Sequence, residues 1–212
     1  MNALKYIADK YNLDITQPSP IEIENVGRNI LGYWFKDLGF MRGVELGVEK
    51  GLFSKILLDA NPEMELNCVV SWKFYSEYNA RLNTPDLPKR FEETQERLKG
   101  YNVKYHKMFS QDAVKRFEDN SLDFIYIDAN HDLPWVMNDI LWWEKKVRPG
   151  GIVCGHDYIR VGTGNTKNFT IEAVNWYTEL KPIKTWFLLG TKAKVPGRIR
   201  DDARSWLWVK EG

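Results

Sequence analysis

The sequence has few of the residues on which disulfide-stabilised and zinc-stapled proteins depend. It contains only two cysteines, Cys68 and Cys154, and three histidines. Each cysteine lies in an apolar stretch typical of a buried strand, where a free thiol behaves as a small hydrophobic side chain. Two isolated cysteines of this kind argue against both a disulfide framework and a zinc site built from cysteine pairs.

The chain also lacks an excess of charge of either sign. Its 30 lysines and arginines nearly balance 29 aspartates and glutamates, which leaves a net charge of +1. A dedicated nucleic-acid binder usually carries a clear basic excess, so we expect no nucleic-acid partner. Basic residues do gather at positions 192–200, but Asp201 and Asp202 follow directly. A solvated loop between two strands explains this pattern in the ordinary way.

Long hydrophobic runs are missing as well. No stretch has the roughly 18 apolar residues of a membrane-spanning helix, and residues 1–12 lack the apolar core of a secretory signal. We therefore expect a cytoplasmic protein with no membrane partner, in which the glycosylation sequon Asn168-Phe169-Thr170 has no role. The length of 212 residues and a hydrophobic share of 43% fit one domain, residues 1–212, with a helical cap at 1–38 and a core at 39–212.

Apolar strands alternate with helical segments along most of the chain. Strands are expected at residues 41–46, 66–70, 103–106, 122–127, 152–154, 184–189 and 205–209. Helices are expected at residues 21–38, 53–61, within 74–100, and at 112–117, 135–147 and 171–180.

This alternation requires a parallel sheet with helices on both faces, and the last two strands, which no helix separates, form an antiparallel hairpin. We therefore predict an α/β fold: a three-layer, doubly wound, seven-stranded and mostly parallel sheet with an antiparallel C-terminal hairpin. Trp186, Trp206 and Trp208 fall in or beside this hairpin, where cross-strand packing is their expected role.

In sheets of this kind, ligands bind at the carboxyl ends of the strands. The first such end carries Gly47 and Gly51, spaced G-x-x-x-G. This spacing is neither the G-x-G-x-x-G of dinucleotide enzymes nor a phosphate-binding loop, so a nicotinamide-dependent oxidoreductase is disfavoured. Glycine lets the backbone turn sharply and approach a ligand closely, although two glycines after a strand more often form only a turn.

Polar side chains follow two later strands. Asp128 ends one, with Asn130 and His131 just beyond it, and His156 and Asp157 end the next. If these strands are neighbours, the side chains converge where they could bind a divalent cation or move protons. The alternative is that Asp128 caps the following helix and Asp157 begins a turn.

Three segments in this order, residues 43–54, 122–131 and 148–158, carry a family resemblance. The chain resembles the class I S-adenosylmethionine (SAM)-dependent methyltransferases over roughly residues 25–209, and in particular the small metal-dependent O-methyltransferases of sugars and natural products. The resemblance implies a SAM-dependent enzyme that methylates a hydroxyl of a small acceptor, with a sugar as one example. A catalytically inactive methyltransferase-like binding or scaffold domain is the alternative.

The resemblance also implies which residues hold SAM. The glycine loop would wrap its methionine part, which implicates Glu45, Gly47, Gly51, Phe53 and Ser54. Ser71 stands where an acid normally grips the ribose, and a hydroxyl cannot make the bidentate charged contact of a carboxylate. The remaining residues implied at the cofactor are Trp72 beside the adenosine, Ser110 and Gln111 at the adenine, and Asp128. An N-cap at Ser110 is a compatible alternative.

By the same resemblance, Asp128, His156 and Asp157 would hold Mg²⁺ or another divalent metal. A histidine in this set favours a softer metal, since Mg²⁺ prefers oxygen ligands. The catalytic residues implied are Asp128, Asn130, His131 and His156. Asn130 occupies the position of a general base and cannot serve as one, so we hypothesise that His131 or His156 takes the proton from the acceptor.

The acceptor itself would be covered by residues 1–38 and by a polar, glycine-containing loop at 159–169, which we interpret as a mobile lid. The sequence does not identify this small molecule. It also leaves the oligomeric state open, with a homo-oligomer as one alternative.

Overall fold

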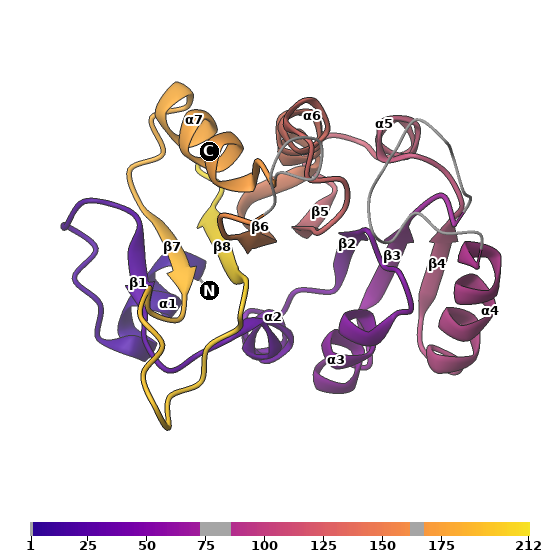
Figure 1. Ribbon diagram of the computed structural model, residues 1–212, viewed down its shortest axis with the longest axis horizontal. Coiled ribbons are helices and arrows are strands. Elements are labelled where there is room, and N and C mark those ends of the chain that lie inside the picture. Colours follow the sequence, from indigo (N-terminus) through magenta and orange to yellow (C-terminus); the bar gives the residue numbers. More distant parts are fainter. Residues whose placement is uncertain (1, 73–85, 162–167) are drawn as a thin grey trace.

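The computed structural model describes residues 2–72, 86–161 and 168–212. Within them the chain builds one eight-stranded sheet with the strand order β1-β7-β8-β6-β5-β2-β3-β4. All neighbouring strands run parallel except those beside β8, which is antiparallel to both β6 and β7. Figure 1 shows this sheet running across the molecule, with helices on both of its sides.

The strands of the sheet are β1 (Ile21–Ile23), β2 (Arg42–Leu46), β3 (Glu65–Val69), β4 (Val103–His106), β5 (Leu122–Ile127), β6 (Val147–Tyr158), β7 (Trp186–Leu189) and β8 (Arg204–Val209). The α-helices are α1 (Ala3–Tyr11), α2 (Leu31–Asp37), α3 (Leu52–Ala60), α4 (Leu87–Arg97), α5 (Ser110–Ala113), α6 (Leu133–Trp143) and α7 (Thr170–Leu180). Three short 3₁₀ helices complete the described elements: η1 (Arg28–Ile30), η2 (Val114–Arg116) and η3 (Glu144–Lys146).

The predicted three-layer α/β architecture, with its mostly parallel sheet and antiparallel C-terminal hairpin, is confirmed. The sheet has one more strand than the seven predicted, because β1 pairs in parallel with β7. The predicted helix at 21–38 is therefore wrong at its start. Ile21 and Ile23 are buried while Glu22 between them is partly exposed, so these residues follow the two-residue period of a strand.

Two apolar clusters fill the space between the layers. One joins α1, α2 and α3 to one face of the sheet, and the other joins α6 and α7 to the opposite face. Successive residues of β5 divide between them: Phe124 and Tyr126 face the first cluster, Ile125 and Ile127 the second. Figure 1 shows α5, α6 and α7 along one side of the sheet and α1, α2 and α3 along the other.

The tryptophans of the C-terminal hairpin pack as expected. Trp186, Trp206 and Trp208 are all at most 5% exposed, and the rings of Trp206 and Trp208 stack with centroids 5.1 Å apart. Cys68 and Cys154 are free and buried, which confirms their predicted role as inert core residues.

Two predictions fall partly outside the described residues. The helix expected within 74–100 is seen as α4, and residues 73–85 before it are not described. The loop expected to act as a lid at 159–169 contains residues 162–167, which are not described either. Within the described ranges, no helix has both the length and the apolar character needed to cross a membrane.

Candidate functional site

Four side chains meet at the carboxyl ends of β5 and β6, which are neighbouring parallel strands. Nε2 of His131 lies 2.8 Å from Oδ2 of Asp157 and 3.6 Å from Oδ1 of Asp128. Nδ1 of His156 lies 3.3 Å from Oδ1 of Asp157 and 3.8 Å from Oδ2 of Asp128. Both carboxylates therefore face both imidazoles, and the predicted convergence of these residues is present in the fold. We call these four residues the Asp–His cluster.

A bulge in β6 makes this arrangement possible. Successive residues of a regular strand point to opposite faces, which would separate His156 from Asp157. The pairing of β6 with β8 changes register between Gly155 and Tyr158, and Asp157 has a left-handed backbone with φ 57°. Bulges re-aim side chains in this way, frequently beside functional sites. The turn predicted as an alternative role for Asp157 is present too, because the N–H of Ile159 donates to its carbonyl at 2.7 Å.

Arg28, in η1, is a further member of the site that the sequence did not reveal. Its Nη1 donates to Oδ2 of Asp128 at 3.2 Å, and its guanidinium lies over the ring of Phe53, 5.0 Å from the centroid. The backbone N–H of Arg28 donates to Asp201 at 2.6 Å. Asp128 is thus held between a guanidinium and an imidazole, and it does not cap α6, whose N-cap is Asp132.

The electrostatics of the cluster favour charged histidine and aspartate. Burial alone would lower the pKa of His131, but the carboxylates of Asp128 and Asp157 outweigh it and raise that pKa to about 10. Burial likewise opposes ionisation of Asp157, yet its contacts with His131 and His156 hold its pKa below the usual range. The N–H of His131 is not aligned for a hydrogen bond with either carboxylate, so the pair is an ion pair rather than a hydrogen bond.

The donor set fits a divalent metal ion. One ligand atom each from Asp128, His131 and Asp157 lie within 4.8 Å of one another, and Nε2 of His131 is buried without a hydrogen-bond partner. Two carboxylate oxygens with an imidazole nitrogen suit a transition ion better than Mg²⁺. The predicted set named His156 as the nitrogen ligand, whereas this geometry groups His131 with the two aspartates. A metal would have to displace the proton of His131 and the contact of Arg28 with Asp128.

Residues 168 and 169 hold the backbone of the cluster in place by hydrogen bonds. The side-chain amide of Asn168 donates to the carbonyl of Asp157 at 3.3 Å, and the N–H of Phe169 donates to the carbonyl of His131 at 3.0 Å. Asn168 also accepts a hydrogen bond from the N–H of Thr170 at the start of α7. The sequence motif Asn168-Phe169-Thr170 therefore has a structural role: it links the segment after β5 to the end of β6 by hydrogen bonds.

The glycine loop lies directly beside Asp128. Gly47 has φ 86°, and a Cβ built there would lie 1.8 Å from the carbonyl oxygen of Asp128. Gly51 has φ 70° and is the N-cap of α3, with Thr94 of α4 packed against it. The requirement for glycine at position 47 therefore comes from the contact between two backbones, in a conformation that other residues rarely adopt.

Glu45 and Ser54 form a buried pair beneath this loop. Oγ of Ser54 donates to Oε2 of Glu45 at 2.5 Å, and both side chains are at most 3% exposed. Burial raises the pKa of Glu45 to about 7, against the hydrogen bond from Ser54, which lowers it. The ring of Phe53 is 5% exposed and packs on Tyr126, with centroids 4.3 Å apart.

Trp72 supports the loop from the end of β3. Its indole N–H donates to the carbonyl of Glu49 at 2.8 Å, and its ring is 2% exposed and packs on Phe91. Arg90 of α4 binds the Glu49 carboxylate at 2.9 Å. Ser71, just before Trp72, is partly exposed at the same strand end.

The residues expected at the adenine follow β4. Ser110 is the first residue of α5, and its hydroxyl donates to Oδ1 of Asp139 at 2.5 Å. The alternative N-cap role of Ser110 is wrong, because Phe109 is the N-cap and no side chain caps this helix. Gln111 is partly exposed beside it. Asp139, on α6, is 2% exposed and was not identified from the sequence.

Two remaining polar residues have structural partners. Oδ1 of Asn130 accepts a hydrogen bond from the N–H of Asp132 at 2.8 Å and so shapes the turn before α6. His106, the third histidine, contacts Oδ1 of Asn67 at 2.9 Å at the end of β4, outside the Asp–His cluster.

Known structures share this fold. The O-methyltransferase TomG of Streptomyces achromogenes, solved with SAM, aligns with a TM-score of 0.60 and 17% identity over 100% of this chain and 91% of its own. An O-methyltransferase of Bacillus cereus in complex with S-adenosylhomocysteine (SAH) aligns with a TM-score of 0.59 and 16% identity, over 98% of this chain and 89% of its own. At this identity the likeness establishes the fold. No curated protein matches the chain by sequence.

A family comparison carries the assignment further. The sequence model described as "Methyltransferase domain" matches residues 44–158, more than half of the chain. The match spans the glycine loop, both strand ends of the Asp–His cluster and the bulge in β6. It confirms the resemblance on which the cofactor expectation was based. The chain belongs to the methyltransferase domain family and has the fold of the class I SAM-dependent methyltransferases.

Proposed function

We propose that this protein is a SAM-dependent O-methyltransferase that acts on a small hydroxylated acceptor, for which a sugar is a suitable class. The observation that carries the proposal is the Asp–His cluster, which lies at the carboxyl ends of β5 and β6 and touches the glycine loop through Gly47. Transfer to oxygen needs a group that removes the proton of the acceptor, and this cluster offers carboxylates and imidazoles for that step.

In this proposal, SAM lies along the edge formed by the ends of β2, β3 and β4. The glycine loop, with Glu45 and Ser54 beneath it and Phe53 at the start of α3, would form the wall at the methionine part. Ser71 and Trp72 would lie near the ribose, and Ser110 and Gln111 near the adenine. The contact of Gly47 with Asp128 then brings the methyl donor next to the proton-accepting residues.

The chain's contribution to the reaction is alignment and proton removal. The acceptor oxygen attacks the methyl carbon in line with the departing sulfur, so donor and acceptor must be held in fixed geometry. His156 takes the hydroxyl proton, or His131 does so once it has lost the proton that the two carboxylates hold on it; Asp157, which contacts both rings, orients them. Arg28 orients Asp128 from the other side.

A divalent metal would bind through Asp128, His131 and Asp157, with His156 as the further candidate. When bound, it would lower the pKa of the acceptor hydroxyl as a Lewis acid. The cluster geometry supports this part of the proposal, as does Nε2 of His131, which is buried without a hydrogen bond and faces both carboxylates.

Calorimetric titration of the purified protein with SAM and SAH, with and without Mn²⁺ or Mg²⁺, tests the cofactor and the metal separately. We expect SAM binding, and we expect metal to increase methylation of hydroxylated acceptors, measured as SAH release. If neither SAM binding nor turnover changes when metal is added, only the metal-dependence part of the proposal is wrong. Absence of binding to SAM and SAH would leave the alternative of a methyltransferase-like binding or scaffold domain.

The proton-transfer step is tested by His131→Ala and His156→Ala. We expect at least one to lower kcat by roughly 10²- to 10⁴-fold, the usual contribution of general base catalysis. His106→Ala is the matched control, because this histidine lies on β4 with Asn67 as its partner. Full turnover in both cluster variants would show that neither histidine is the base.

A further inference from the structure

The loop between β7 and β8, residues 190–203, lies at the same edge of the sheet as the Asp–His cluster. β7 runs parallel to β1 and antiparallel to β8, which is itself antiparallel to β6, so β7 and β6 end on the same side. Two strand spacings separate β7 from β6, about 10 Å at ~4.8 Å each. Ligands of doubly wound sheets bind along this edge.

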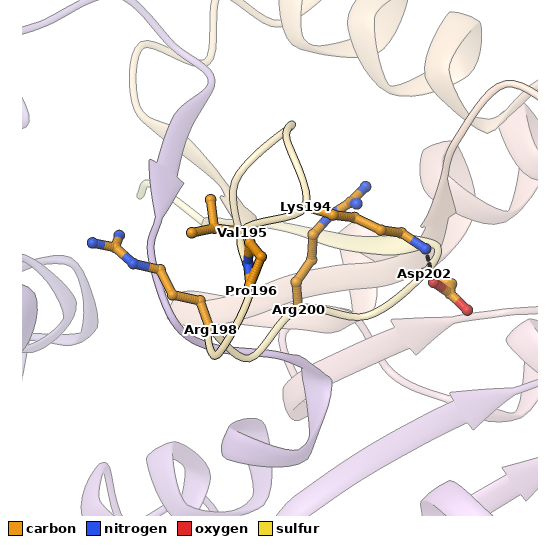
Figure 2. Close-up of a pocket in the computed structure, with 6 residues that line it drawn as sticks. All are labelled: Lys194, Val195, Pro196, Arg198, Arg200 and Asp202. Carbon is orange, nitrogen blue, oxygen red and sulfur yellow. Dashed lines mark hydrogen bonds and ion pairs between the residues drawn. The ribbon is translucent and has the colours of Figure 1, made fainter.

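This loop lines an open, basic cavity at the surface. Its lining residues are Lys194, Val195, Pro196, Arg198, Arg200 and Asp202, and its volume is about 290 Å³. That volume is close to the lower end of small-molecule sites, roughly 300 Å³. Figure 2 shows Lys194 and Arg200 with their cationic groups on one side of the loop, while Arg198 points to the other side.

The cations of this cavity outnumber its anions by three to one. Lys194 pairs with Asp202 at 2.6 Å, and Arg198 pairs with Glu24. Both pairs are exposed: the side chains of Lys194 and Asp202 are 73% and 89% accessible. Exposed ion pairs of this kind contribute little and are readily exchanged for another anion.

Arg200 differs from the other two cations of the cavity, Lys194 and Arg198, each of which forms an ion pair. Its Nε is buried and has no hydrogen-bond partner, and no ion pair of Arg200 exists among the residues that the structure describes. Its side chain packs close to Gly190, where an added Cβ would come within 2.8 Å of Cγ. A guanidinium presents a planar fork of donors that matches phosphate and carboxylate oxygens, so Arg200, a lining residue without an ion pair in the described part of the chain, suits an anionic ligand.

The cavity is connected to the catalytic edge through a short chain of contacts. Asp201, between the two lining residues Arg200 and Asp202, accepts a hydrogen bond from the N–H of Arg28 at 2.6 Å. Arg28 in turn binds Asp128 at 3.2 Å. A molecule that places a hydroxyl at the Asp–His cluster would need its anionic group roughly 10 Å away, the separation of β6 from β7, to reach this cavity as well.

We propose that the cavity lined by Lys194 and Arg200 binds an anionic group of the acceptor, a phosphate ester or a carboxylate, and so selects acidic acceptors over neutral ones. The inference rests on the proposed function and specifies its substrate class. Asp202 lines the cavity and the whole chain has a net charge of only +1, so a single anionic group fits better than the extended phosphate backbone of a nucleic acid.

The direct test uses inorganic phosphate and acetate as probes, followed by NMR of the arginine Nε–H groups in the full-length protein. We expect phosphate or acetate to shift one such signal, and Arg200→Gln to remove it and weaken the binding by about tenfold or more. The probe that binds more tightly distinguishes a phosphate ester from a carboxylate. Lys192→Ala is the matched control, since Lys192 lies on the same loop, is exposed and does not line the cavity.

A turnover test follows with a neutral sugar, its phosphate ester and its uronic acid. The acidic acceptors should have the lower KM, and Arg200→Gln should raise that KM roughly 10- to 100-fold while leaving the KM of the neutral sugar unchanged. Arg200→Lys should retain part of the preference, and its thermal unfolding checks that the loop variants remain folded.

Equal binding of both probes by Arg200→Gln and the Lys192→Ala control would overturn the inference, as would equal KM values for neutral and acidic acceptors. Tight binding of a single-stranded oligonucleotide that depends on Arg200 would also overturn it in favour of a nucleic-acid ligand. Phosphate binding at Arg200 in a protein that transfers no methyl group would instead overturn the proposed function and leave an anion site.

Discussion

At the scale of single residues, Asp139 has an unusual electrostatic environment outside the Asp–His cluster. It sits 2% exposed on α6 with Ser110 as its hydrogen-bond partner. Burial raises its pKa to about 7, and the bond from Ser110 lowers it only in part. Its carboxyl group is therefore partly protonated in the folded protein near neutral pH.

This environment predicts a pH-dependent cost in stability. Between about pH 4 and 7 the folded protein retains a proton on Asp139 that the unfolded chain has lost, so the free energy of unfolding falls as the pH rises through this window. The cost is absent below pH 4 and complete above pH 7, and it is on the order of 2–4 kcal/mol. Urea unfolding of Asp139→Asn should show a stability that rises relative to the wild type between pH 4 and pH 8.

Ser110→Ala provides the control for this comparison. Removing the bond that lowers the pKa of Asp139 should extend the loss of stability to higher pH and so enlarge it, while the double variant should resemble Asp139→Asn alone. If the free energies of unfolding of the wild type and Asp139→Asn change with pH in parallel, the raised pKa of Asp139 is wrong.

At the scale of elements, β1 shows how a short strand can be hidden in a sequence. Ile21, Ile23 and Val26 fit a helical repeat as well as they fit a strand followed by a turn. The strand forms because residues 21–23 pair with β7, more than 160 residues away along the chain. The backbone hydrogen bonds of this pairing cannot be predicted from the local sequence pattern.

We expect Ile23→Ala to lower the free energy of unfolding by about 2–4 kcal/mol, because Ile23 is 0% exposed in the core. Ile199→Ala is the matched control, since Ile199 is 63% exposed and its loss should change stability by no more than about 0.5 kcal/mol. Urea denaturation of both variants measures the difference. Similar values for the two would argue that residues 21–23 are not a buried strand.

The site divides in the same way into what the sequence could and could not predict. Asp128, His156 and Asp157 could be found because each ends an apolar strand, and the topology of parallel strands brings such ends together. Arg28 and Asp139 could not, because their contacts join residues 100 and 29 positions apart without a motif at either end. The His131 ring could be placed near the site, but its nearness to both carboxylates depends on the bulge at Asp157.

At the scale of the whole molecule, the strand order places the proposed SAM site and the proposed acceptor site in different halves of the sheet. β2, β3 and β4 lie on one side of β5, where the proposed SAM site is, and β6, β8, β7 and β1 lie on the other. The proposed acceptor site and the anion cavity both belong to the second half. The N-terminal residues join this half through β1, which pairs with β7, and through Arg28, which binds Asp128. Segments from both the N-terminal and the C-terminal part of the chain therefore lie on the proposed acceptor side.

The proposed SAM site, at the ends of three central strands, predicts that the product SAH stabilises the whole molecule. At a SAH concentration 100 times its Kd, the free energy of unfolding should rise by about 2.7 kcal/mol, which for a chain of this size raises Tm by roughly 5–10 °C. Differential scanning fluorimetry measures this shift. NAD⁺ at the same concentration is the control, because the glycine loop lacks the dinucleotide spacing; an unchanged Tm with SAH, or an equal shift with NAD⁺, would count against the cofactor assignment.

The close approach of Gly47 to Asp128 sets the spacing between these two halves. Where the backbones meet, the carbonyl of Asp128 fills the space that a side chain on residue 47 would need. In the proposed function, the gap between methyl donor and proton acceptor would therefore be set by two main chains in contact, not by flexible side chains whose rotamers vary. Such a contact would act as a fixed spacer: the surrounding loops could accommodate acceptors of different shapes while the distance of methyl transfer stayed the same.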